Sequence, residues 1–138
     1  MRIPIAILDQ NADFLRLLTY VLRERDSEEI EIIAASSDMN TLLAQTTQAP
    51  AVALIGLSVP NLVDEHMISQ LRVHWPYVGI LVLSSLEQAE YYQQALASGA
   101  DAVISKLQLA TELLPAIQKL YNLPSREQND GNIASDQG

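Results

Sequence analysis

Cysteine is absent from this sequence of 138 residues, and its absence excludes several kinds of site. Disulfide bonds, thiolate nucleophiles and cysteine-based zinc sites are ruled out, and a reducing cytoplasm becomes the natural location. Histidine is nearly as scarce, because His66 and His74 are the only two. Their spacing does not match the i, i+4 pair of a helical metal site, so we expect both to be inert.

The sequence also lacks long apolar runs and an excess of basic residues. No apolar stretch approaches the ~20 residues that span a membrane, and the N-terminus has no signal-peptide pattern. Lys and Arg number 8 against 17 Asp and Glu, giving a formal net charge of −9. Binding to double-stranded nucleic acid depends on Lys and Arg side chains that neutralise the phosphates. We therefore expect a cytoplasmic protein that binds neither membranes nor, by itself, nucleic acid. The acidic balance either favours basic partner surfaces or simply maintains solubility.

The length and the 49% hydrophobic content predict one domain with a substantial core. We place this domain at residues 1–121. Residues 122–138 are polar, and we expect a disordered tail or the start of a linker to a missing output domain. The segment Leu123-Pro-Ser-Arg-Glu-Gln128 resembles the beginning of a helix-turn-helix output domain, although the motif is short.

Five apolar runs predict β-strands. The central one, Ala51–Ile55, is almost continuously apolar, which is typical of a parallel strand covered on both faces, and Gly56 ends it. The five expected strands are residues 2–8, 30–35, 51–55, 78–83 and 102–105.

Amphipathic segments between these runs predict five helices. The first has apolar residues at Phe14, Leu17, Leu18, Val21 and Leu22 and an N-cap at Asn11. The acidic residues that follow, from Glu24 to Glu31, predict a solvated connection. The second helix is expected to begin after a cap at Ser37 or Asp38, and the third to end near His74. The fourth is expected over residues 87–98, with Gly99 as its C-terminal stop, and the fifth over residues 111–120. The last boundary places Pro115 in the first helical turn, where a missing N–H costs little.

Five strands that alternate with five helices predict an α/β fold, a flavodoxin-like doubly wound parallel sheet of order 2-1-3-4-5. The carboxyl ends of its strands form one rim. That rim brings together Asp9, Gln10 and Gly56, with Ser84 and Lys106 at the ends of the next two strands.

Four segments on this rim resemble the receiver domain of bacterial two-component response regulators, over roughly residues 2–120. They are Ile5-Ala-Ile-Leu-Asp9, Gly56-Leu-Ser-Val-Pro60, Val82-Leu-Ser84 and Gly99-Ala-Asp-Ala-Val-Ile-Ser-Lys106. The resemblance implies a phosphoryl group accepted by an aspartate at the end of the third strand. It also implies Mg²⁺ held by acids after the first strand, and a lysine and a hydroxyl that bind the phosphoryl oxygens.

This sequence retains only part of that machinery. Asp9 and Lys106 match the family, and Ser84 matches in chemistry. Gln10 replaces the second acid, and Gly56 replaces the phosphoacceptor.

Two further family positions also differ. Leu107 stands in place of proline, and Val103 stands in place of the switching Tyr or Phe, so the usual aromatic switch is missing.

Without a carboxylate at position 56 no acyl phosphate can form there, whatever the other residues do. We therefore expect a degenerate receiver with no catalytic residues, no enzymatic activity and no cofactor. Asp9 either retains a weak metal role or serves as a cap or ion-pair partner, and a direct Asp9–Lys106 ion pair could replace the metal. The Ser84 hydroxyl either remains a pocket residue or bonds nearby backbone.

The expected function is an atypical receiver module of a phosphorelay that acts through protein contacts, as a dimer or with a constitutive partner. It could be the regulatory part of a transcription regulator. In the family the usual interface is the fourth helix, fifth strand and fifth helix, which here comprises Tyr91, Tyr92, Gln94, Ala102, Val103, Gln118 and Tyr121. The alternatives are a small-molecule sensor that uses the emptied pocket and a phosphotransfer protein with another acceptor.

Overall fold

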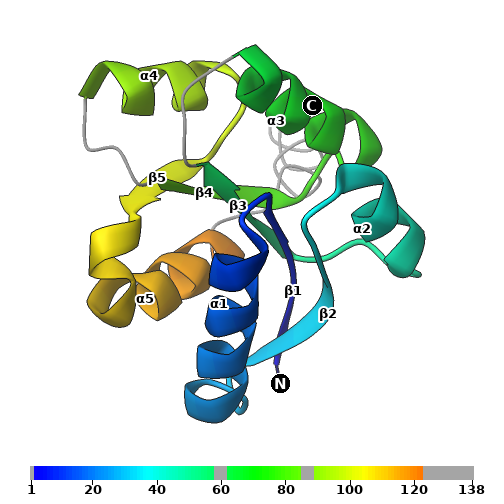
Figure 1. The fold of residues 1–138 in the computed structure, drawn as a ribbon, viewed down its shortest axis with the longest axis vertical. Coiled ribbons are helices and arrows are strands. Elements are labelled where there is room, and N and C mark those ends of the chain that lie inside the picture. Colours follow the sequence, from blue (N-terminus) through cyan, green and yellow to red (C-terminus); the bar gives the residue numbers. More distant parts are fainter. Residues whose placement is uncertain (1, 58–61, 85–88, 123–138) are drawn as a thin grey trace, which may run out of the picture.

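The computed structural model describes residues 2–57, 62–84 and 89–122, which form a single parallel sheet flanked by helices (Figure 1). The strands are paired in the order β2-β1-β3-β4-β5. This arrangement confirms the flavodoxin-like fold predicted from the sequence. The strands are β1 (Ile3–Asp9), β2 (Ile30–Ser36), β3 (Val52–Leu57), β4 (Gly79–Ser84) and β5 (Ala102–Ser105).

The helices cover both faces of the sheet, with α1 and α5 on one side and α2, α3 and α4 on the other (Figure 1). A short 3-10 helix, η1 (Lys106–Gln108), connects β5 to α5. The helices are α1 (Ala12–Arg25), α2 (Met39–Gln45), α3 (Leu62–His74), α4 (Ala89–Ala97) and α5 (Leu109–Asn122). None of the helices within the described residues is both long and apolar enough to cross a lipid bilayer.

The central strand β3 is apolar along its length because both of its faces are buried. Val52 and Leu54 belong to the apolar cluster beneath α1 and α5, whereas Ala53 and Ile55 belong to the cluster beneath α2, α3 and α4. Side chains alternate between the two faces of a strand. The parity therefore directs position 56 toward the α1 and α5 side, which is also the side of Asp9.

Two predicted N-caps are present. The Asn11 side chain accepts hydrogen bonds from the backbone N–H groups of Asp13 and Phe14, at 3.0 and 3.1 Å, at the start of α1. Asp38 caps α2 and accepts from both the backbone N–H and the hydroxyl of Thr41, each at 2.9 Å. These two bonds, the backbone bond above all, lower the pKa of the Asp38 carboxyl, because they stabilise its charged form.

The strand ends differ from the sequence expectation by one residue. Gly56 does not end β3, because the strand continues to Leu57. Gly56 is paired with Asp9 across β1 and β3, and Leu57 is paired with Ser84 across β3 and β4. Pairing on both sides therefore extends the sheet through the glycine.

The last helix starts earlier than expected. Helix α5 begins at Leu109 and contains Pro115 in its interior, so the prediction that Pro115 lies in the first turn was wrong. Leu113 and Ile117 are buried against the sheet, whereas Pro115 is exposed. Burial of this apolar stripe outweighs the hydrogen bond that proline cannot make.

Two side chains around α1 also differ from expectation. Leu17, predicted on the apolar face, is 60% exposed. Asp26, predicted in a solvated connection, is 4% exposed and lies at the C-cap of α1. Its carboxylate pairs with Arg25 at 3.2 Å, which compensates for the burial of its charge.

Candidate functional site

Asp9 and Gly56 lie side by side at the carboxyl edge of the sheet. They are direct partners in the ladder between β1 and β3, and both are buried. Asp9 has 1% of its surface exposed, which is unusual for a carboxylate and requires compensating contacts.

The Asp9 carboxylate occupies the space above Gly56. A Cβ atom added to Gly56 would lie 1.7 Å from Oδ2 of Asp9 and 2.5 Å from its Cγ. Real Cβ atoms do not approach other atoms so closely, so any side chain at position 56 requires Asp9 to move. The glycine is therefore needed for this arrangement of Asp9.

Lys106 is the charged partner of Asp9. Its Nζ donates to Oδ2 of Asp9 at 2.9 Å, and the two side chains are 11% and 1% exposed. The other carboxylate oxygen accepts the backbone N–H of Asn11 at 2.8 Å. The ion pair that the sequence suggested is thus present, and each oxygen of the buried carboxylate has a donor.

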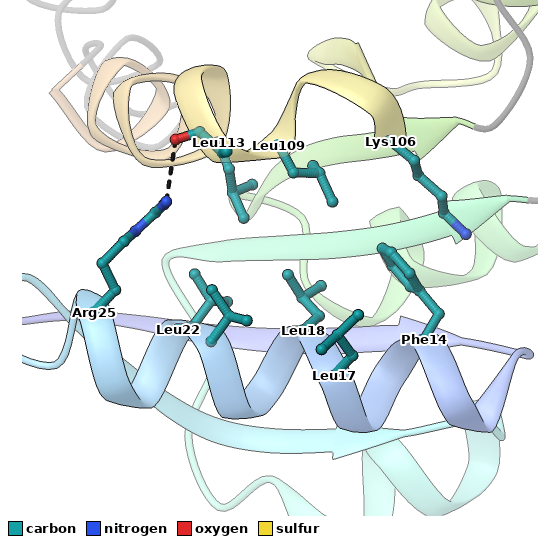
Figure 2. Close-up of a pocket in the computed structure, with 10 residues that line it drawn as sticks. Phe14, Leu17, Leu18, Leu22, Arg25, Lys106, Leu109 and Leu113 are labelled. Atoms are coloured by element: carbon teal, nitrogen blue, oxygen red, sulfur yellow. Dashed lines mark hydrogen bonds between the residues drawn. The ribbon is translucent and has the colours of Figure 1, made fainter.

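Phe14 completes the environment of the lysine. The Lys106 ammonium lies 4.1 Å from the centroid of the Phe14 ring, within range of a cation–π interaction (Figure 2). Sequence reasoning assigned Phe14 to the apolar face of α1 and missed this role. The signal was available only through the fold, which sets the first turn of α1 beside η1.

The other rim residues are dispersed. Gln10 is exposed, and it is absent from the Asp9–Lys106 contacts. Ser84 is fully buried at the end of β4, where it is paired with Leu57 and Ser105. Leu107, in the place of the family proline, lies in η1 with 79% of its surface exposed.

The described side chains around Asp9 do not fit Mg²⁺. This ion requires several oxygen ligands in octahedral geometry, usually including carboxylates. Among the residues that the structure describes, Asp9 is the one carboxylate paired with Lys106, and its Oδ2 already binds that ammonium. Across residues 2–57, 62–84 and 89–122, no three acidic, histidine or cysteine side chains cluster closely enough to hold a metal ion.

The sequence profile of the response regulator receiver domain matches residues 5–118, which cover most of the chain. The chain belongs to this family. Among curated proteins none matches the sequence significantly.

Solved receiver structures have the same fold. RcsB of Salmonella typhimurium is 19% identical with a TM-score of 0.69, and the match covers 86% of this chain and 60% of RcsB. The signal receiver domain of NarL from Mycobacterium tuberculosis is 19% identical with a TM-score of 0.70, covering 87% and 96%. The BeF3-activated receiver domain of DrrB is 16% identical with a TM-score of 0.68, covering 89% and 100%. The match thus spans about 60% of the length of that RcsB chain.

The residues predicted to form an interaction face occupy different environments. Tyr92 and Val103 are half-buried and pack against the cluster beneath α2, α3 and α4, and Ala102 packs against the cluster beneath α1 and α5. Gln118 is half-buried, and Tyr121 is 41% exposed. The predicted contributions of Tyr91 and Gln94 lie outside the described side chains.

An apolar groove runs between α1 and α5, with a volume of about 220 Å³. Phe14 and Lys106 lie at one end of it (Figure 2). At the other end the Arg25 guanidinium donates to the Ala110 carbonyl at 3.1 Å and bridges the two helices. The sequence did not indicate this groove, because it depends on how two distant helices pack.

Proposed function

We propose that this chain is a receiver module that takes no phosphoryl group at the third-strand position and acts through protein contacts. The observation that carries the proposal is the position of the Asp9 carboxylate, 1.7 Å from where a Cβ of residue 56 would lie. Formation of an acyl phosphate at this position requires a carboxylate there. In this receiver the position has no side chain, and the adjacent space contains the Asp9–Lys106 ion pair.

The ion pair also changes the role of the lysine. In the family the lysine neutralises phosphoryl oxygens, but here its ammonium is 2.9 Å from Asp9. A buried pair of this kind resists separation, because removal of either partner leaves an uncompensated charge. The pair holds the rim in one arrangement without phosphate or metal. We accordingly propose that the module catalyses no reaction of its own.

The proposed output is contact with a protein partner or a second copy through α4, β5 and α5. Tyr121 supports this choice, since it is a partly exposed aromatic residue on α5 and tyrosine is enriched at interfaces. RcsB has been solved bound to the promoter rprA, and another similar structure is a DNA-binding response regulator of the LuxR family from Staphylococcus aureus. We propose that this module likewise belongs to the regulatory part of a transcription regulator.

The alternative of a small-molecule sensor at Gly56 has less support. The space that the missing acceptor would leave contains the Asp9 carboxylate.

Intact-mass analysis tests the phosphorylation half of the proposal. Wild type is incubated with a small-molecule phosphodonor and Mg²⁺, beside the variant Gln10→Asp/Gly56→Asp, which restores the second acid and the acceptor. We expect no phosphoryl adduct on wild type, and an adduct on the variant would show that the donor reaches the rim. An adduct on wild type would overturn the proposal.

Sedimentation analysis tests the contact face. Tyr121→Glu on α5 is compared with Tyr20→Glu on α1, where the tyrosine is 64% exposed on another surface. We expect wild type to associate reversibly, Tyr121→Glu to weaken association and Tyr20→Glu to leave it unchanged, all irrespective of phosphodonor. Equal behaviour of the two variants would argue against the face assigned here.

A further inference from the structure

Arg72, in the last turn of α3, connects three segments of the chain. Its Nη1 donates to the carbonyl oxygens of Pro76 and Val78, which precede β4. Its Nη2 donates to the carbonyl oxygen of Gly99 at 2.9 Å and to Oδ2 of Asp101 at 3.0 Å. The Arg72 and Asp101 side chains are 22% and 18% exposed, so the pair is largely shielded from water. One guanidinium therefore fastens the end of α3 to the start of β4 and to the turn between α4 and β5.

Asp101 extends the connection into the sheet. Its Oδ2 also accepts the backbone N–H of Ile80 at 2.8 Å, and its own N–H donates to the Ile80 carbonyl at 2.8 Å. These bonds fix the chain entering β5 against β4 before the regular ladder begins at Leu81 and Ala102.

Gly99 shapes the turn that Arg72 holds. Its φ of 120° is a conformation that favours glycine, and it lies two residues after the end of α4. The N–H of Ala100 bonds to the Ala95 carbonyl and the N–H of Gly99 to the Leu96 carbonyl, which is a Schellman arrangement. The Gly-Ala-Asp segment that supported the family resemblance thus has a physical role, because it supplies hydrogen-bond acceptors for Arg72.

Helix α4 has little apolar anchorage of its own within the part of the chain that is described. Ala95 is buried and Tyr92 is half-buried, whereas Leu96 is 46% exposed. Segments with few buried apolar contacts open locally before the rest of the protein unfolds. Among the described contacts of α4, the hydrogen bonds to Gly99 and Asp101 are therefore a large part of what holds its C-terminal end.

We infer that Arg72 is a positioning residue that controls a separate opening unit, residues 92–104, by clamping Gly99 and Asp101 to the end of α3. The described hydrogen bonds of Arg72 reach none of Gly56, Asp9 and Lys106, so α3 holds the turn between α4 and β5 separately from the Asp9–Lys106 ion pair. Any event that withdraws Arg72 or Asp101 releases α4 while β1, β3 and α1 remain folded. The clamp is thus a conformational device at the proposed contact face, and it stands whether or not position 56 accepts phosphate.

Native-state hydrogen exchange, followed by mass spectrometry at increasing urea concentrations, tests the inference. The proteins are wild type, Arg72→Met, Asp101→Asn and the control Arg16→Met. Arg16 forms an ion pair with Asp13 on the same helix at 3.0 Å, and the two side chains are 77% and 93% exposed. Arg72→Met preserves the length of the side chain but removes its hydrogen bonds, and Asp101→Asn removes the charge but keeps an acceptor.

In wild type we expect peptides from residues 92–104 to exchange through an opening that is less sensitive to urea than global unfolding. In Arg72→Met they should exchange about tenfold to a hundredfold faster, as expected for the loss of one or two charge-assisted hydrogen bonds. Peptides from β1 and α1 should exchange only slightly faster, and Arg16→Met should resemble wild type.

Equal acceleration of exchange in all peptides would show a merely structural role for Arg72 and overturn the inference. Should Arg72→Met not fold, Asp101→Asn gives the same comparison. Exchange of residues 92–104 only through global unfolding in wild type would also overturn it.

Discussion

Replacement of Gly56 by alanine should destabilise this receiver strongly, and only because of Asp9. The backbone at Gly56 lies outside the positive-φ region, so alanine meets no backbone strain there. The new Cβ would lie 1.7 Å from Oδ2 of Asp9, so the carboxylate must turn away from Lys106. The structure therefore predicts that the cost of Gly56→Ala is the cost of breaking the ion pair.

The size of the destabilisation by Gly56→Ala follows from the burial of the Asp9–Lys106 ion pair. Breaking a buried ion pair costs about 3–5 kcal/mol, since a buried charge loses its counter-charge. Asp9→Ala should lower the free energy of unfolding by a similar amount, because Lys106 loses the same partner. In the Asp9→Ala background the nearest remaining atom is the Cβ of residue 9, at 3.1 Å. Gly56→Ala should then cost only about 1 kcal/mol or less, which gives a coupling of about 3 kcal/mol.

Urea unfolding of wild type, both single variants and the double variant measures this cycle. Gly79→Ala is the control, because Gly79 is also a glycine in a parallel strand, at the start of β4. A Cβ there would meet Leu120 at 3.4 Å and the Ala51 carbonyl at 3.5 Å, which are ordinary contacts. Its effect on the unfolding free energy should be within about 1 kcal/mol of zero.

If the losses of unfolding free energy in Gly56→Ala and Asp9→Ala simply add up in the double variant, the proposed link between the two residues is wrong. Equal effects of Gly56→Ala in the presence and absence of the Asp9 carboxylate would mean that Asp9 does not occupy the space at position 56. A neutral effect of the single variant would mean the same.

Three further predictions concern single side chains. Phe14→Leu should lower the unfolding free energy by about 1 kcal/mol more in wild type than in a Lys106→Met background, because only wild type has the cation–π contact; urea unfolding measures both. Asp38→Ala should destabilise α2 at neutral pH. The pKa of Asp38 is lowered by folding, so its contribution is present above the ordinary value of 3.8 and is lost as pH falls through the folded value. Thermal unfolding from pH 7 to pH 3 should show the variant converging on wild type, whereas a constant difference would contradict the assignment. Pro115→Ala should raise the unfolding free energy by about 1–3 kcal/mol, because it restores a donor inside α5; an unchanged urea midpoint would show that the helix already compensates.

Local patterns in the sequence were sufficient to predict the order of the elements. Continuous apolar runs such as Ala51–Ile55 are typical of strands buried on both faces, and the Asn11 and Asp38 caps follow from side-chain chemistry within a few residues. The membership of Asp9, Gly56 and Lys106 in one rim followed from topology alone, since the carboxyl ends of parallel strands share an edge.

Local rules failed where long-range packing opposed them. Because proline fits the first turn of a helix, the position of Pro115 led us to expect a helix that begins near Thr111. Burial of Leu113 and Ile117 instead extends α5 back to Leu109. Leu17 fits the apolar period of α1, yet the adjacent groove leaves it exposed.

The sequence by itself determined which chemical groups are present, above all the absence of a carboxylate at position 56 and the retention of Asp9 and Lys106. Only the tertiary structure decided how those groups meet. The Asp9 carboxylate lies over Gly56, the Lys106 ammonium lies over Phe14, and the contacts of Arg72 reach 27 and 29 residues along the chain. A side chain adopts one rotamer among several according to the atoms packed around it, and here those atoms come from segments far apart in the sequence.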